Sequence, residues 1–171
     1  MEEGWIVFSG DEFSIDLQIR GSWVWAKKGS KPLFPCQTRK GKVKIFGALN
    51  NKKGKVMTLS SKKINRFAFI KFLKKLMHYH KKVFLIVDNA SWHKAREVRE
   101  FLIANRKRIR ISYFPPYSPE YNPSEYCWKA VKRDLITTKL FLSTESMEEQ
   151  LQDYFRKKSF FGLKLERYLS P

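Results

Sequence analysis

The first third of the chain alternates hydrophobic and polar residues as a half-buried strand does. In DEFSIDLQI, every second residue from Phe13 to Ile19 is apolar and the residues between them are polar. Asp11 falls on the apolar side of that alternation. Further strands are predicted over residues 22–29 (SWVWAKKG), 42–49 (KVKIFGAL) and 55–60 (KVMTLS), and the loop NNKKG joins the last two as a hairpin.

The period of the pattern changes after Ser61. Apolar residues at helical spacing from Phe69 to His80 predict an amphipathic helix, and KVFLIVDN is typical of a strand buried on both faces. The pattern then predicts a helix from residue 92 or 93 to about 105, a strand over 108–114, a helix that ends near 135 after a proline-rich stretch, and a last helix with Thr144 as its N-cap. This order predicts a single α/β domain over residues 1–171 with a mixed sheet.

The charge of the chain indicates the kind of partner. The chain holds 35 Lys and Arg residues against 16 Asp and Glu residues, a formal charge of +19 at pH 7. Such an excess is expected mainly where a polyanion offsets it, so nucleic acid is the predicted partner. No apolar stretch is long enough to span a membrane, no signal-peptide pattern is present, and two cysteines are no disulfide framework. We therefore expect a cytoplasmic, nucleoid-associated protein.

Three acidic residues stand in unusual places. Asp11 lies on the apolar face of a strand, Asp88 ends the apolar run FLIVD, and Glu125 opens a helix directly after a rigid loop. Ligands usually bind at the C-terminal strand edges of open α/β sheets. Carboxylates that converge there repel one another unless a divalent cation compensates them, which predicts a site for Mg²⁺ or Mn²⁺. Two such ions can clamp the attacking and leaving oxygens of a phosphodiester displacement.

Each acid also has a purely structural interpretation. Asp88 and the asparagine after it have the composition of a turn, and Asp11 follows a Ser-Gly pair whose turn amide it could bind. Glu125 could belong to a capping box with Asn122 as N-cap and Pro123 as the first helical residue.

The prolines before the last acid favour the metal interpretation. Pro115, Pro116, Pro119 and Pro123 restrict the backbone that leads to Glu125. A metal ligand has to be held within about 0.5 Å of its working position, and a rigid lead-in achieves this.

Three blocks of the sequence, SGDEF, VDNASWH and FPPYSPEYNPSEYCWKAVKRDL, resemble the signature blocks of the DDE transposases of the mariner superfamily, in particular of its bacterial and archaeal insertion-sequence branch. The last block is the most specific, and the resemblance extends from Trp5 to about Leu135. It implies an RNase H-like fold, with a mixed five-stranded sheet flanked by helices. It also implies that Asp11, Asp88 and Glu125 are the catalytic and metal-binding residues.

The resemblance further implies a reaction. Two Mg²⁺ or Mn²⁺ ions per active site would support cleavage of DNA at the element ends and transfer of the freed 3′-hydroxyl into target DNA. Asp11 would bridge the ions, and Asp88 and Glu125 would each complete one site. Glu12 and Glu120 match family positions outside this set. The candidate DNA-binding residues are Lys71, Lys74, Lys75, His93, Lys129, Lys132 and Arg133.

The sequence departs from the family pattern at its beginning. Family members usually carry helix-turn-helix modules before the first catalytic Asp, whereas ten residues precede Asp11 here. We expect a catalytic domain without its end-recognition part, as a frameshift product, a truncated copy or an excised fragment, and a separate DNA-binding segment encoded upstream is a possible partner. Its DNA binding should be weak, salt-sensitive and largely nonspecific.

Three alternatives stay open. Another RNase H-like nuclease would lack strand joining, and a catalytically idle DNA-binding remnant would bind no metal. The apolar tail SFFGLKLERYLSP could pack on its own sheet or dock onto a second copy in a homodimer.

Overall fold

A mixed five-stranded sheet forms the centre of the computed structural model, which describes residues 4–17, 25–31, 40–116, 118, 121–136 and 139–161. The strands are β1 (Ile6–Asp16), β2 (Lys42–Asn50), β3 (Val56–Ser60), β4 (Val83–Val87) and β5 (Ile109–Tyr113), in the spatial order β3-β2-β1-β4-β5. The central strand β1 pairs antiparallel with β2 and parallel with β4. The predicted mixed five-stranded sheet is therefore confirmed.

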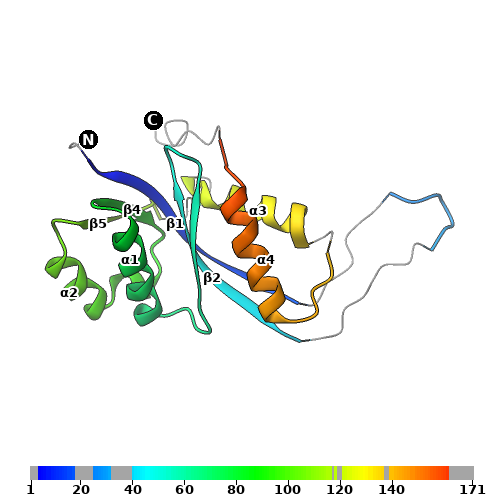
Figure 1. Cartoon of the computed structure of the whole chain (residues 1–171), viewed down its shortest axis with the longest axis horizontal. Coiled ribbons are helices and arrows are strands. Elements are labelled where there is room, and N and C mark those ends of the chain that lie inside the picture. Colours follow the sequence, from blue (N-terminus) through cyan, green and yellow to red (C-terminus); the bar gives the residue numbers. More distant parts are fainter. Residues whose placement is uncertain are drawn as a thin grey trace.

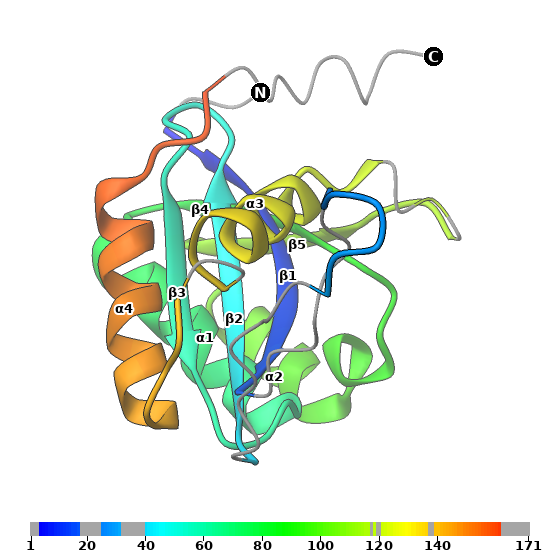
Figure 2. The ribbon, with the colours of Figure 1, turned by 90° about the vertical axis from the view of Figure 1, so that its right-hand side faces the viewer.

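Helices cover both faces of the sheet (Figure 1). Helices α1 (Arg66–Tyr79) and α2 (Arg96–Ala104) lie on one face, and α3 (Ser124–Val131) and α4 (Thr144–Lys157) lie on the other. A 3₁₀ turn, η1 (Ser91–Lys94), precedes α2, and a π-helical turn, η3 (Lys132–Ile136), follows α3. The turned view in Figure 2 shows α3 in front of the sheet and α4 beside β3. Among the described residues, no helix has the length and apolarity needed to cross a membrane.

The alternation in β1 divides its side chains between two cores. Phe13, Ile15 and Leu17 are buried beneath α3 and α4, whereas Phe8 is buried beneath α1 and α2. Because successive side chains of a strand point to opposite faces, Asp11 shares the face of Phe13 and the adjacent Glu12 points to the other. The two neighbouring acids of β1 are thus separated by the sheet itself.

Three local predictions differ from the structure. Residues 25–29 of the strand predicted over 22–29 form no strand, and 22–24 lie outside the described residues. The helix predicted from residue 92 or 93 is interrupted at Ala95, whose ψ of 151° is incompatible with a continuous helix, so α2 begins only at Arg96. The N-cap of α4 is Ser143, not Thr144, because the Ser143 side chain accepts a hydrogen bond from the Ser146 amide.

Candidate active site

The register of the two parallel central strands sets two of the predicted acids side by side. Ser9 of β1 is the register partner of Ile86 of β4, and Asp11 and Asp88 each lie two residues further along. Asp88 directly follows β4, at the edge where ligands usually bind to α/β sheets. The charge of Asp88 is close enough to influence the pKa of Asp11.

Two residues of α3 that flank Glu125 in the sequence, Ser124 and Trp128, form hydrogen bonds with β1. The Ser124 hydroxyl donates a hydrogen bond of 2.8 Å to the backbone carbonyl of Ser9, and the Trp128 indole N–H donates one of 2.9 Å to Oδ2 of Asp11. Glu125 lies between these two residues in the first turns of α3. Its side chain is 43% exposed and pairs with Lys129, whose Nζ lies 3.5 Å from Oε2.

A glycine makes room for the indole. Gly47 of β2 is the register partner of Asp11, and a Cβ atom at Gly47 would overlap the six-membered ring of Trp128. The Trp128 ring also stacks on Phe13, with ring centroids 4.9 Å apart. The contact between Trp128 and Asp11 therefore depends on the packing of β1, β2 and α3 together.

The Asp11 carboxylate is held by neutral donors. Its Oδ1 accepts a 2.8 Å hydrogen bond from the Glu12 amide, and its Oδ2 accepts the indole N–H of Trp128. Burial raises the pKa of Asp11 to about 6; the two hydrogen bonds oppose this rise, and the charges of Glu12 and Asp88 add to it. Among the described residues, no Lys, Arg or His forms an ion pair with Asp11.

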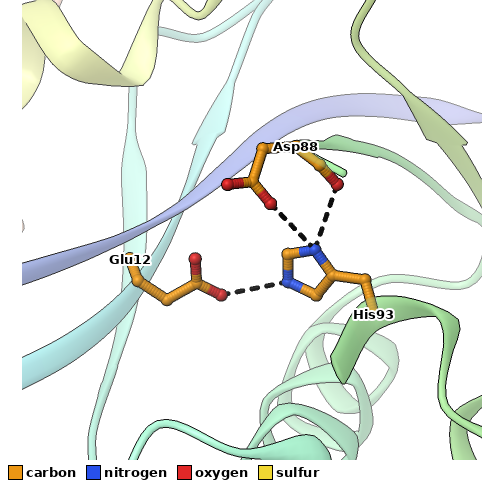
Figure 3. A group of neighbouring side chains, drawn as sticks. All are labelled: Glu12, Asp88 and His93. Carbon is orange, nitrogen blue, oxygen red and sulfur yellow. Dashed lines mark hydrogen bonds and ion pairs between the residues drawn. The ribbon is translucent and has the colours of Figure 1, made fainter. Parts of the chain in front are cut away.

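The buried side chain of His93 lies between the carboxylates of Glu12 and Asp88 (Figure 3). His93 Nε2 lies 3.0 Å from Glu12 Oε1, and His93 Nδ1 lies 3.1 Å from Asp88 Oδ1 and 3.2 Å from the Asp88 carbonyl oxygen. Glu12, Asp88 and His93 could hold a metal ion, because their potential ligand atoms all lie within 4.8 Å of one another. In the described part of the chain, no other three His, Cys, Asp or Glu side chains form such a group.

The two carboxylates around the imidazole of His93 favour its charged form. Burial disfavours the charged ring, but the hydrogen bonds to Asp88 and Glu12 outweigh it and raise the pKa of His93 to about 9. The same hydrogen bond from His93 lowers the pKa of Asp88. His93 has no exposed surface, so its position does not support the predicted direct contact with DNA.

Hydrogen bonds hold both ends of the segment between β5 and α3. The Phe114 amide donates to the Val87 carbonyl, and the Asn89 side chain donates a 2.8 Å hydrogen bond to the Phe114 carbonyl. At the other end Pro123 is buried, and Asn122 Oδ1 accepts a 3.1 Å hydrogen bond from the Ser124 amide. Pro119 and Glu120 lie outside the described residues.

The predicted lysine and arginine contacts lie on two separate helices. On α1, Lys71 is exposed, Lys74 lies over the Phe101 ring, and Lys75 donates to the Thr58 carbonyl. After Glu125, Lys129 pairs with that acid. The next two cations are exposed, with Lys132 above the Phe13 ring and Arg133 in contact with Asp134.

Sequence reasoning did not identify three of the contacts at this edge. The sequence pattern assigns no role to Trp128 or Ser124, and the family resemblance leaves Glu12 outside the catalytic set. A buried tryptophan three residues after a candidate ligand was the available signal, since a buried indole N–H usually finds an acceptor.

Comparison with known proteins gives the family of this chain. Residues 6–148 match the family model described as DDE superfamily endonuclease. The chain is 34% identical over 134 residues to the insertion element IS630 uncharacterized 39 kDa protein of Shigella sonnei, covering 77% of this chain and 38% of that protein. It is 25% identical over 161 residues to the Tc3 transposase of Caenorhabditis elegans, covering 88% of this chain and 48% of that protein.

A solved structure shows the fold. The Mos1 transposase paired-end complex with the left transposon end superimposes with a TM-score of 0.69 at 21% identity, over 95% of this chain and 51% of that chain. The predicted RNase H-like fold is thereby confirmed. The chain spans less than half the length of the two curated relatives it matches. Because the family model covers most of its length, the chain belongs to the family of DDE superfamily endonucleases.

Proposed function

We propose that this chain is the catalytic domain of a metal-dependent DNA transposase, which cleaves DNA at element ends and transfers the 3′-hydroxyl into target DNA. One observation supports the proposal: strand β4, which ends directly before Asp88, and helix α3, which carries Glu125, both contact the central strand β1, which carries Asp11. Asp11 and Asp88 lie at corresponding positions of neighbouring strands, and α3, which carries Glu125, is attached to β1 through Ser124 and Trp128.

The donor set fits a hard divalent cation. Asp11, Asp88 and Glu125 offer carboxylate oxygens, which Mg²⁺ and Mn²⁺ prefer. Asp11 is largely buried without a cationic partner among the described residues, and its raised pKa reflects this uncompensated charge. Mos1 mariner paired-end complexes have been solved with Mn and with Mg. We propose that the three acids of this chain hold two such ions.

The bound ions would supply a nucleophile from water or from a 3′-hydroxyl and would stabilise the leaving oxygen. The protein's own contribution is to hold the ligands. The Trp128 indole and the Glu12 amide orient Asp11. The Ala90 amide donates a hydrogen bond of 3.0 Å to Oδ1 of Asp88, and Glu125 lies in the first turn of α3.

DNA is the proposed substrate. The net charge of +19 supports a polyanionic partner, and the Mos1 structures include a strand transfer complex. Lys129, which pairs with Glu125, and Lys132, which lies over the Phe13 ring, are exposed and could approach phosphates. A second copy of the chain, a DNA-binding segment encoded upstream and an association with the nucleoid remain part of this proposal.

The decisive test is an assay of strand joining. The purified chain is incubated with supercoiled plasmid and a labelled duplex that carries a free 3′-hydroxyl, in Mn²⁺ or Mg²⁺. We expect nicking of the plasmid and covalent joining of the label, both abolished by EDTA. Asp11→Asn, Asp88→Asn and Glu125→Gln should each lower the rate by about 10³-fold or more, because ligands that act as a unit fail together.

Glu100→Gln is the matched control. Glu100 is an exposed acid of α2 that pairs with Arg96, and its replacement should leave the rate unchanged. Full activity in any of the three ligand variants would contradict the proposed site. Cleavage of RNA–DNA hybrids without joining would indicate a different RNase H-like nuclease.

A further inference from the structure

The environment of His93 is built to fix its ring. The residue lies in η1, directly after the strand that delivers Asp88, and it is fully buried. Its ring packs on Phe69 of α1, with centroids 4.3 Å apart, and Trp92 lies edge-on to it at 5.8 Å. The Tyr113 hydroxyl donates to the backbone carbonyl of His93. A ring held in this way has few alternative orientations.

His93 contacts one oxygen of Asp88 and leaves the other one available. Within the described residues, the side-chain contacts of Asp88 all fall on Oδ1, which accepts the Ala90 amide and faces Nδ1 of His93. The Asp88 side chain is 52% exposed, so packing alone does not fix its orientation. Two donors on Oδ1 direct Oδ2 away from the histidine.

Glu12 fixes the opposite side of the ring. Its Oε1 lies 3.0 Å from Nε2 of His93 and accepts a 3.4 Å hydrogen bond from the Trp92 indole. The Glu12 side chain is only 15% exposed. Because Glu12 points to the opposite face of β1 from Asp11, its carboxylate is committed to the histidine rather than to the face of Trp128.

We propose that His93 is a positioning residue that orients the Asp88 carboxylate for metal binding through Nδ1, and that Glu12 holds His93 in place through Nε2. This inference rests on the proposed metal-dependent function and adds two residues to its machinery. Partners of this kind that hydrogen-bond a metal ligand typically contribute 10- to 100-fold to metal affinity, as an order of magnitude.

Direct coordination of a metal by His93 is the competing arrangement, since Glu12, Asp88 and His93 offer clustered ligand atoms. The contacts argue against it. Each ring nitrogen already faces one carboxylate, so a cation could bind the ring only by displacing Glu12 or Asp88.

Two isosteric substitutions separate the two sides of the ring. The amide nitrogen of an asparagine side chain lies where Nδ1 of a histidine lies, whereas that of glutamine lies where Nε2 lies. His93→Asn therefore keeps a donor to Asp88, and His93→Gln keeps a donor to Glu12 only. We expect His93→Gln to weaken Mn²⁺ binding by about 10- to 100-fold and His93→Asn by less than about 3-fold.

The measurement is calorimetric titration of the DNA-free chain with Mn²⁺, at a temperature where circular dichroism shows each variant folded. Glu100→Gln is again the control. In the joining assay, His93→Gln should raise the Mn²⁺ concentration needed for half-maximal rate while the rate at saturating Mn²⁺ stays within about 3-fold of the original. A merely structural role would lower the amount of folded protein without this shift.

Several outcomes would overturn the inference. Equal Mn²⁺ affinity in both variants would remove the positioning role while leaving the proposed function intact, whereas no Mn²⁺ binding by the unaltered chain would overturn both. If His93→Gln does not fold, nuclear magnetic resonance of the unaltered chain decides. The Nδ1–H proton of His93, which the proposal requires as the donor to Asp88, should persist at saturating Mg²⁺, and its loss would overturn the positioning role.

Discussion

Two carboxylates of the candidate site, Asp11 and Asp88, are held by residues from different sides of the sheet and by different chemistry. On the side of α3, Asp11 receives the neutral N–H groups of Trp128 and of the Glu12 backbone. On the side of α1, Asp88 faces the charged imidazole of His93, whose ring packs on Phe69. Asp11 therefore keeps an uncompensated charge, whereas the charge of Asp88 is compensated from within the protein.

This difference indicates where an added cation contributes most. A buried carboxylate without a cationic partner is costly in the absence of metal, and a divalent ion removes that cost. Asp88 gains less from the ion because His93 already lowers its pKa. In the proposed site, Asp11 would depend on a bound cation to compensate its charge, whereas Asp88 already pairs with His93.

The largest expected effect is on the pH dependence of metal-free stability. The pKa of Asp11 rises from 3.8 to about 6 on folding, so its contribution to stability is greatest at low pH and is lost as pH rises through about 6. The pKa of His93 rises from 6.5 to about 9, so its contribution is present below 6.5 and is lost as pH rises through about 9. Each change amounts to at most roughly 3 kcal/mol.

Chemical unfolding in EDTA between pH 4 and pH 9 checks this comparison. Asp11→Asn should remove the decline between about pH 4 and pH 6 and keep the later one, and His93→Gln should do the reverse. Asp88 has the opposite sign, since a lowered pKa gives stability that is lost as pH falls through it, below this range. Identical curves for the two variants would show that the two faces do not differ.

Only part of this comparison was predictable from the sequence. The alternation in β1 placed Asp11 on the apolar side, and the apolar run before Asp88 placed that acid at a strand end, because both patterns depend on local geometry. The pairing of Glu12 with His93 depends on strand register and on the interruption at Ala95, which are tertiary features. Likewise, Trp128 reaches Asp11 only because Gly47 leaves space on the neighbouring strand.

A smaller effect is expected from removing one indole donor on each face. Trp128→Phe keeps an aromatic ring but leaves Oδ2 of Asp11 without its 2.9 Å donor, so the pKa of Asp11 should rise further and Mn²⁺ should bind about 10-fold more weakly. Trp92→Phe removes the longer 3.4 Å contact to Glu12 and should change Mn²⁺ affinity by less than about 3-fold. Calorimetric titration of both variants measures the difference, and a larger loss at Trp92 would reverse the proposed order.

The smallest effect concerns the cations of the two faces. Lys129 of α3 lies next to Glu125, whereas Lys71 lies on the exposed side of α1. If DNA approaches the shared edge from the side of α3, Lys129→Ala should weaken binding about 5-fold and lower the slope of log affinity against log salt by about 1. Lys71→Ala should change affinity by no more than about 2-fold. Fluorescence anisotropy over a range of salt concentrations measures both. An equal loss of DNA affinity in the two lysine variants would mean that DNA contacts both faces of the sheet. The three acids would then lie beneath the middle of the duplex rather than at its side.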